Sequence, residues 1–209
     1  MSLGDYLQLY GDQVAWLAWQ HFLLFAISLG GATLIGIGLG IAVSKERAAA
    51  AVAVPVVNVL QACPEVVLLA LSIPLLGIGF EGALVPLFVK GVLPILRNTA
   101  SGLESVDRGM IEASHALGYA PRQVLLRIEL PAALPVIIAG MRVSAVMLVS
   151  VLTLTAYIGV ESLGTLIVQG IARMDTAPLV IGSLLTAVFA VAVNYLLVGA
   201  ERLAARRLS

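Results

Sequence analysis

Residues 107–131 read DRGMIEASHALGYAPRQVLLRIELP. This is the longest stretch with recurring polar residues in a chain that is otherwise almost entirely apolar. They predict two short helices joined by a turn. Asp107 can cap the first helix, because its carboxylate accepts hydrogen bonds from the free N–H groups of the first turn. Gly118 can end that helix in a left-handed conformation, and Pro121 can begin the second, where its missing N–H costs nothing. We expect Pro131 to close the unit, so that each helix is only about 15 Å long.

The rest of the chain has the composition of an integral membrane protein. Of its 209 residues, 60% are hydrophobic and 11% are charged, and the mean hydropathy is +1.05. A soluble domain has about a quarter of its residues charged. Long continuous apolar runs, without the alternation of a barrel strand, predict a single all-α membrane domain over residues 1–209. The net charge is zero and the basic residues are scattered, so nothing suggests nucleic-acid binding.

Five membrane spans are expected, with six as the alternative. Residues 1–20 predict an amphipathic helix on the membrane surface, anchored by two interfacial tryptophans. The alternative is a frayed tail that leads into the first span. Residues 48–79 are too long for one span of roughly 20 residues and too short for two, so we interpret them as one broken span. The spans are residues 22–43, the broken segment 48–79, residues 83–96, residues 132–157 with an apolar core at 143–157, and residues 177–198; residues 99–106 form a linker, and residues 159–175 an amphipathic connector.

The first span is rich in glycine, and small residues let helices approach closely in lipid. This face could pack against a second subunit, but packing within the chain is the simpler expectation. Its glycines are Gly30, Gly31, Gly36, Gly38 and Gly40.

The basic residues indicate the orientation, because cytoplasmic loops are enriched in Lys and Arg. With five spans and the N-terminus outside, only Arg173 is clearly outside. The inverted topology would reverse this distribution, so residues 107–131 and the C-terminus are expected in the cytoplasm. The residues placed inside are Lys45, Arg47, Arg97, Arg108, Arg122, Arg127, Arg202, Arg206 and Arg207.

No residue cluster predicts catalysis, a metal site or a cofactor in this chain. His21 and His115 would lie on opposite sides of the membrane, and Cys63 is alone in an apolar run. A phosphate-binding P-loop needs Gly before its lysine and Ser or Thr after it, and neither Lys45 nor Lys90 has those neighbours. Any ATP must therefore be used by another subunit. Since a simple connector needs no cap, glycine stop and proline restart, we interpret residues 107–131 as a docking element for a cytoplasmic partner.

The same residues resemble a known signature. They are similar to the EAA motif, EAA-x3-G-x9-I-x-LP, of permease subunits in binding-protein-dependent ABC importers. The matching residues are Glu112-Ala113-Ser114, then Gly118 after three residues, then Ile128-Glu129-Leu130-Pro131 after nine more. Only Ser114 departs from it, in place of the second alanine. Further strings are similar to the osmoprotectant branch, which imports glycine betaine, carnitine and choline: they lie at residues 63–64, 75–79, 93–99, 102, 106–107, 157–159 and 162–164.

This resemblance implies a type I ABC importer permease fold in a bacterial cytoplasmic membrane. It implies a second permease subunit, identical or paralogous, two cytoplasmic ATPase subunits that hold ATP and magnesium, and an extracytoplasmic solute-binding protein. Residues 107–131 would then be the coupling unit that transmits the ATPase motion to the spans. The expected coupling residues are Glu112, Ala113, Ser114, Ala116, Gly118 and Arg122.

Two charged residues inside the spans depart from the family pattern. Glu65 stands where a small or apolar residue is more usual, and Lys90 lies in the middle of the third span. An isolated charge at that depth is costly, so one hypothesis is a buried Glu65–Lys90 ion pair. The alternative is that Glu65 faces the pathway and meets a cationic solute. Asn58 and Gln61 share the broken span and are candidates for the same polar region.

Other functions remain as alternatives from the residues alone. A permease for another small solute, such as the amino acid methionine, would keep the same coupling unit. A secondary transporter usually needs more spans and internal repeats, which this chain lacks. A membrane scaffold without cargo would leave the EAA spacing unexplained.

Overall fold

The computed structural model describes residues 2–206, which form an all-α bundle with no strand in that range, as the composition predicts. The elements are α1 (Leu3–Lys45), α2 (Arg47–Ala62), α3 (Glu65–Leu76), α4 (Phe80–Glu104), α5 (Arg108–Ala116), α6 (Pro121–Val124), the π-helical turn Leu125–Glu129, α7 (Leu130–Leu154), the 3-10 turn Thr155–Ile158, α8 (Leu163–Arg173) and α9 (Thr176–Arg206).

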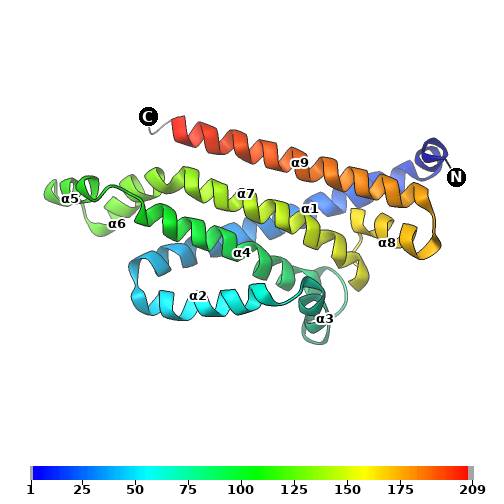
Figure 1. Cartoon of the computed structure of the whole chain (residues 1–209), viewed down its shortest axis with the longest axis horizontal. Coiled ribbons are helices and arrows are strands. Elements are labelled where there is room, and N and C mark those ends of the chain that lie inside the picture. Colours follow the sequence, from blue (N-terminus) through cyan, green and yellow to red (C-terminus); the bar gives the residue numbers. More distant parts are fainter. Residues whose placement is uncertain (1, 207–209) are drawn as a thin grey trace.

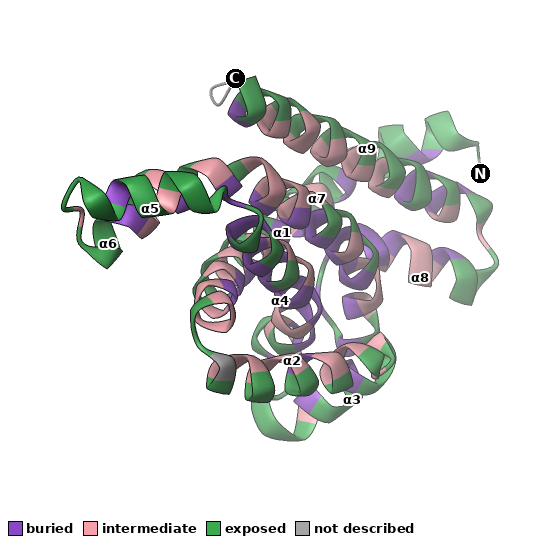
Figure 2. Ribbon diagram, turned by 60° about the vertical axis from the view of Figure 1, so that its left-hand side comes forward, coloured by how far each residue is buried: buried purple, intermediate pink, exposed green. Residues whose placement is uncertain are grey.

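The bundle is elongated, and its long helices run roughly along one axis (Figure 1). Helix α4 packs between α1 and α7, and α9 packs along α7. Helices α5 and α6 project at one end, whereas α8 and the N-terminal part of α1 lie at the other (Figure 1). Buried positions face inward along α1, α4 and α7, and exposed positions cover the outside (Figure 2). The main apolar core includes Leu24, Leu87, Leu148 and Leu152, each at most 1% exposed.

Most of the expected spans correspond to helices of the right length and composition. In the described residues, three helical runs are long and apolar enough to cross a membrane: α1, the continuous run Pro121–Ile158, and α9. Helices α2 and α3 pass the same test as a pair bent by 103°, which agrees with one broken span. Helix α4 is not among these runs, and it carries Lys90 in its middle. Its position between α1 and α7 places this charge in protein rather than in lipid.

The expected boundary between a surface helix and the first span is wrong. Helix α1 is continuous across residue 20, and its only non-helical residue is Tyr10, with φ −121° and ψ 16°. Beyond this kink, Val14 and Leu17 are buried against the α8–α9 region, so tertiary packing keeps the helix intact. Any surface segment is therefore limited to the first turns of α1.

Residues 99–106 do not form the expected linker, because α4 continues to Glu104. Thr99 is 0% exposed and Leu103 5%, so the buried face of the helix extends past Leu96. The glycines of α1 allow this contact: a Cβ at Gly40 would lie 2.5 Å from the Thr99 Cβ atom. Gly31 and Gly36 also face α4, which confirms packing within the chain at these positions, whereas Gly30 and Gly38 have nothing within 4 Å.

Pro131 does not close the second helix of the coupling unit. The chain stays helical from Pro121 through Leu154, so that helix is the beginning of the fourth span. Pro131 has no N–H to donate, and the widened π-helical turn Leu125–Glu129 directly before it accommodates the missing bond. Arg142 lies within α7, and its Nε atom is 3.6 Å from a Glu201 carboxylate oxygen of α9.

Candidate functional site

Helix α5 has the local structure that its sequence predicts. The Asp107 Oδ1 atom accepts a hydrogen bond of 2.6 Å from the Gly109 N–H and so caps the helix. At the other end, Gly118 has φ +84°, a left-handed conformation that favours glycine. Its N–H donates to the His115 carbonyl at 2.9 Å, and the Tyr119 N–H donates to the Ser114 carbonyl at 3.1 Å. The helix therefore begins and ends where its caps place it.

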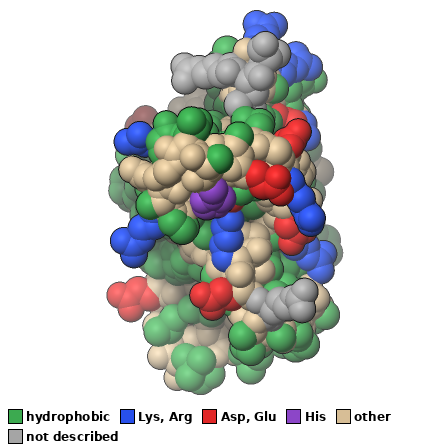
Figure 3. Space-filling model, turned by 90° about the vertical axis from the view of Figure 1, so that its left-hand side faces the viewer, with side chains coloured by type: hydrophobic (Ala, Val, Ile, Leu, Met, Phe, Trp, Pro, Cys, Tyr) green, Lys and Arg blue, Asp and Glu red, His purple; other side chains and the backbone are tan. Residues whose placement is uncertain are grey.

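The expected coupling residues lie together at the α5 end of the molecule. Glu112, Ala113, Ala116, Gly118 and Arg122 are all exposed. Ser114, the departure from the motif, is 6% exposed, and its Oγ atom donates to the Met110 carbonyl at 2.7 Å. The substitution therefore lies on the inner face of α5 and leaves the outer face unchanged. Charged side chains of both signs surround apolar patches on this end of the molecule (Figure 3).

The apolar part of the same surface comes from large side chains at the ends of both short helices. Met110 is 51% exposed, Leu117 80% and Leu126 63%. Single exposed apolar residues are ordinary, but several around a capped, projecting helix make a surface that a partner protein can cover.

An ion pair that the sequence did not reveal anchors this end to α1. The Lys45 Nζ atom lies 2.8 Å from Glu129 Oε1 and 2.5 Å from Oε2. The Glu129 side chain is 5% exposed and that of Lys45 is 46% exposed. Glu129 occupies the unspecified position of the I-x-LP string, and Lys45 is 84 residues away in the chain. No local pattern connects two residues so far apart.

The pair also borders a cavity of about 220 Å³ beneath α5. It lies where the end of α1 meets α6 and the π-helical turn, and α5 contributes His115 to it. It is lined by Lys45, His115, Pro121, Arg122, Val124, Leu125 and Glu129.

The second polar region is the elbow between α2 and α3, where Cys63 and Pro64 separate the two helices. The last carbonyls of a helix have no partner within it. Here the Lys90 Nζ atom donates to the carbonyls of Gln61, at 2.9 Å, and Cys63, at 2.7 Å. In return, the Gln61 side-chain amide donates to the Lys90 carbonyl at 2.8 Å. Lys90 of α4 therefore caps the end of α2 and holds the bend.

The position of Glu65 agrees in part with both hypotheses, an ion pair with Lys90 and a side chain that faces an open space. Its Oε1 atom lies 3.3 Å from Lys90 Nζ, so the ion pair is present. The pair is only half buried, however, because the Lys90 side chain is 4% exposed and that of Glu65 is 38% exposed. Glu65 also lines a cavity of about 260 Å³ together with Met147 and Ser150 of α7. It can therefore pair with Lys90 and face an open space at once.

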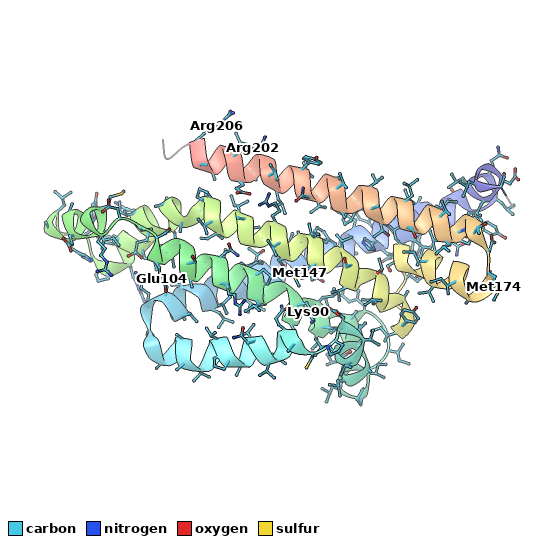
Figure 4. All side chains as sticks on the ribbon, viewed as in Figure 1. Lys90, Glu104, Met147, Met174, Arg202 and Arg206 are labelled. Carbon is cyan, nitrogen blue, oxygen red and sulfur yellow. The ribbon has the colours of Figure 1, made fainter. Side chains whose placement is uncertain are left out.

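A neighbouring cavity of about 320 Å³ extends this polar region along α4 and α7. Gln61, Arg97, Asn98 and Met147 contribute to its lining, and Met147 lines both cavities. Asn58 joins the same region, since its Oδ1 atom accepts a hydrogen bond of 2.6 Å from Arg97 Nη2. Met147 on α7 and Lys90 on α4 both lie in the middle of the bundle (Figure 4).

The structure keeps the other candidate groups apart. His21 is fully buried within α1, and His115 is exposed on α5. Among the described residues, no group of three or more His, Cys, Asp or Glu could hold a metal ion. The elbow and the α5 surface are also separate regions of the molecule (Figure 1).

The fold is shared with solved importer structures. A chain of the inward-facing MetNI methionine ABC transporter matches with a TM-score of 0.82 and 22% identity, covering 98% of this chain and 99% of that one. A chain of an amino acid ABC transporter with histidines matches with a TM-score of 0.79 and 18% identity. At these identities the likeness concerns the fold, and it confirms the type I importer permease architecture.

Sequence relatives are more similar. The choline transport system permease protein OpuBB of Bacillus subtilis is 33% identical over 198 residues, which are 95% of this chain and 91% of the relative. The carnitine transport permease protein OpuCD of Listeria monocytogenes is 35% identical over 202 residues, 96% of this chain and 91% of the relative. Residues 32–209 match the family described as "Binding-protein-dependent transport system inner membrane component". The chain therefore belongs to this family of multi-pass inner membrane transport components.

Proposed function

We propose that this permease forms the pathway of an ATP-driven importer for quaternary ammonium solutes such as choline, carnitine and glycine betaine. The observation that carries the proposal is the alignment with choline and carnitine permeases over nine-tenths of both chains. Membership of the binding-protein-dependent family excludes a secondary transporter or a scaffold. Methionine is less supported, because the MetNI likeness is one of fold at 22% identity.

The distribution of charge supports an orientation with the N-terminus outside and the C-terminus in the cytoplasm. Basic residues collect around the α5 end, including Lys45, Arg108 and Arg122, and Arg202 and Arg206 lie at the same end (Figure 4). Arg173 lies on α8, at the opposite end. Arg207, also expected inside, lies outside the described residues. This orientation places α5 in the cytoplasm and α8 on the outer side.

In this orientation α5 receives the ATPase. ATP and magnesium are held by that subunit, and the solute-binding protein delivers its solute at the α8 side. A second permease subunit, identical or paralogous, completes the pathway. Motion at α5 reaches the spans through α6, because α6 continues into α7 without a break.

Cross-linking can test where the ATPase binds. Ala116→Cys, made in a Cys63→Ser background, is expected to cross-link to the ATPase in the assembled importer, because Ala116 is exposed on α5. Ala172→Cys is the matched control, since it is exposed on α8 at the other end. Equal yields at the two sites, or none at Ala116, would contradict the docking role of α5.

Uptake tests the substrate class. Cells that lack their own osmoprotectant importers would express the permease with its ATPase and binding protein. We expect saturable uptake of labelled choline, carnitine or glycine betaine that disappears when the ATPase is omitted. Uptake of labelled methionine with none of the quaternary ammonium solutes would overturn the proposal.

A further inference from the structure

A separate cavity of about 280 Å³ lies at the end of the molecule opposite α5. It is formed where the N-terminal part of α1 meets the junction of α8 and α9 (Figure 1). Its volume is close to the lower limit of small-molecule sites, roughly 300 Å³. No coupling or pathway residue discussed above contributes to it. The lining residues are Tyr6, Tyr10, Gln13, Gln169, Arg173, Asp175 and Pro178.

The cavity carries one positive and one negative group, and a tight turn brings them together. Met174, between Arg173 and Asp175, has the left-handed conformation with φ 52° and ends α8. Asp175 caps the next helix, because its Oδ1 atom accepts a hydrogen bond of 3.1 Å from the Ala177 N–H. The Oδ2 atom takes no part in this cap.

Aromatic rings form the opposite wall. Tyr6 and Tyr10 are four residues apart on α1 and therefore share a face, with ring centroids 4.9 Å apart. A tyrosine ring face attracts a cation through its quadrupole, and its hydroxyl can donate to an anion. The tyrosine wall can therefore contact both charges of a ligand whose anionic group binds Arg173 and whose cationic group binds Asp175.

The surroundings place this cavity at the boundary between membrane and water. Trp16 and Trp19 of α1 are 51% and 54% exposed, and exposed tryptophans are enriched at the level of lipid headgroups. Ile171 and Met174 are 57% and 94% exposed on the α8 side. A ligand held in the cavity can therefore extend an apolar portion over exposed apolar side chains.

We propose that this cavity binds the headgroup of a zwitterionic phospholipid, with the phosphate at Arg173 and the ammonium group at Asp175 and the tyrosine rings. Arginine holds phosphate through paired hydrogen bonds, and the carboxylate opposite favours a headgroup that also carries a cation. An anionic headgroup would place its phosphate at the same arginine but leave Asp175 without a cation. The shared chemistry also fits a free zwitterion such as glycine betaine, so the experiment must separate lipid from solute.

The test uses the assembled importer in detergent with short-chain phosphatidylethanolamine or phosphatidylglycerol, and measures binding by native mass spectrometry. We expect phosphatidylethanolamine to bind at least tenfold more tightly than phosphatidylglycerol. Arg173→Gln is expected to lower phosphatidylethanolamine binding about tenfold, and Arg173→Lys, which keeps the charge but loses the paired bonds, to lower it less. Asp175→Asn should reduce the preference between the two lipids, while asparagine keeps the cap on α9.

Arg202→Gln, an exposed substitution at the α5 end, serves as the control and should leave binding unchanged. Excess glycine betaine should not displace the lipid. Equal binding of both lipids, no effect of Arg173→Gln, or displacement by glycine betaine at similar affinity would each overturn the proposal. None of these measurements needs transport activity, so the result is independent of the proposed substrate.

Discussion

Replacing Lys90 with methionine is expected to destabilise the permease by about 3 kcal/mol and to abolish uptake. Methionine fills a similar volume but leaves the carbonyls of Gln61 and Cys63 without their donor at the end of α2. It also leaves Glu65 without its cation. The bend between α2 and α3 then loses the bonds that hold it, in a helix pair that borders both central cavities.

Neutralising Glu65 should have a much smaller effect. Its side chain is 38% exposed, so the pair with Lys90 is partly screened by solvent and contributes about 1 kcal/mol at most. Glu65→Gln keeps an oxygen that can accept from Lys90. We expect thermal unfolding of the purified importer to change little for Glu65→Gln and strongly for Lys90→Met.

The double variant Glu65→Gln/Lys90→Met distinguishes the two roles of Lys90. If its main role is to cap α2, the double variant is as unstable as Lys90→Met alone. Recovery of stability in the double variant would instead mean that the unpaired Glu65 charge caused the damage, and the capping role would be wrong.

The features predictable from sequence are those that depend on neighbours in the chain. Asp107 caps a nearby N–H group, Gly118 adopts a left-handed conformation, and Pro121 begins a helix. Each role depends on the local backbone, so it was predictable from residue type alone. The break between α2 and α3 was predictable for the same reason, because Pro64 interrupts an apolar run too long for one helix.

The predicted helix boundaries were wrong where contacts between distant segments, or an irregular helical turn, determine how far a helix continues. Helix α4 continues to Glu104, and within this stretch Thr99 packs against Gly40 of α1, a contact that the sequence of α4 alone does not indicate. The helix continues through Pro131 because a π-helical turn absorbs the missing N–H. For Lys90, the pair with Glu65 was one hypothesis from the sequence. Its two carbonyl partners could not be predicted, because they depend on how the elbow packs on α4.

The second large effect is expected at the Lys45–Glu129 pair, and it should be asymmetric. Lys45→Met leaves the Glu129 carboxylate, 5% exposed, buried without a partner, which costs about 2–4 kcal/mol. Glu129→Gln leaves Lys45, 46% exposed, free to reach water and should cost about 1 kcal/mol. Thermal unfolding of both variants in the assembled importer measures this difference.

The same pair connects α1 to the turn through which α6 continues into α7, so its loss should also impair coupling. In Lys45→Met we expect uptake to fall more than tenfold while the ATPase keeps hydrolysing ATP, because α5 and α6 can then move without displacing α1.

Arg142→Met is the matched control: its pair with Glu201 is 3.6 Å long and about one-third exposed on both sides, so its loss should cost less than about 1 kcal/mol. The reversed pair Lys45→Glu/Glu129→Lys restores the attraction but buries a lysine, so it should recover only part of the uptake. If Arg142→Met uncouples as strongly as Lys45→Met, or if Glu129→Gln is the more damaging single change, then the buried carboxylate is not what ties the coupling unit to α1.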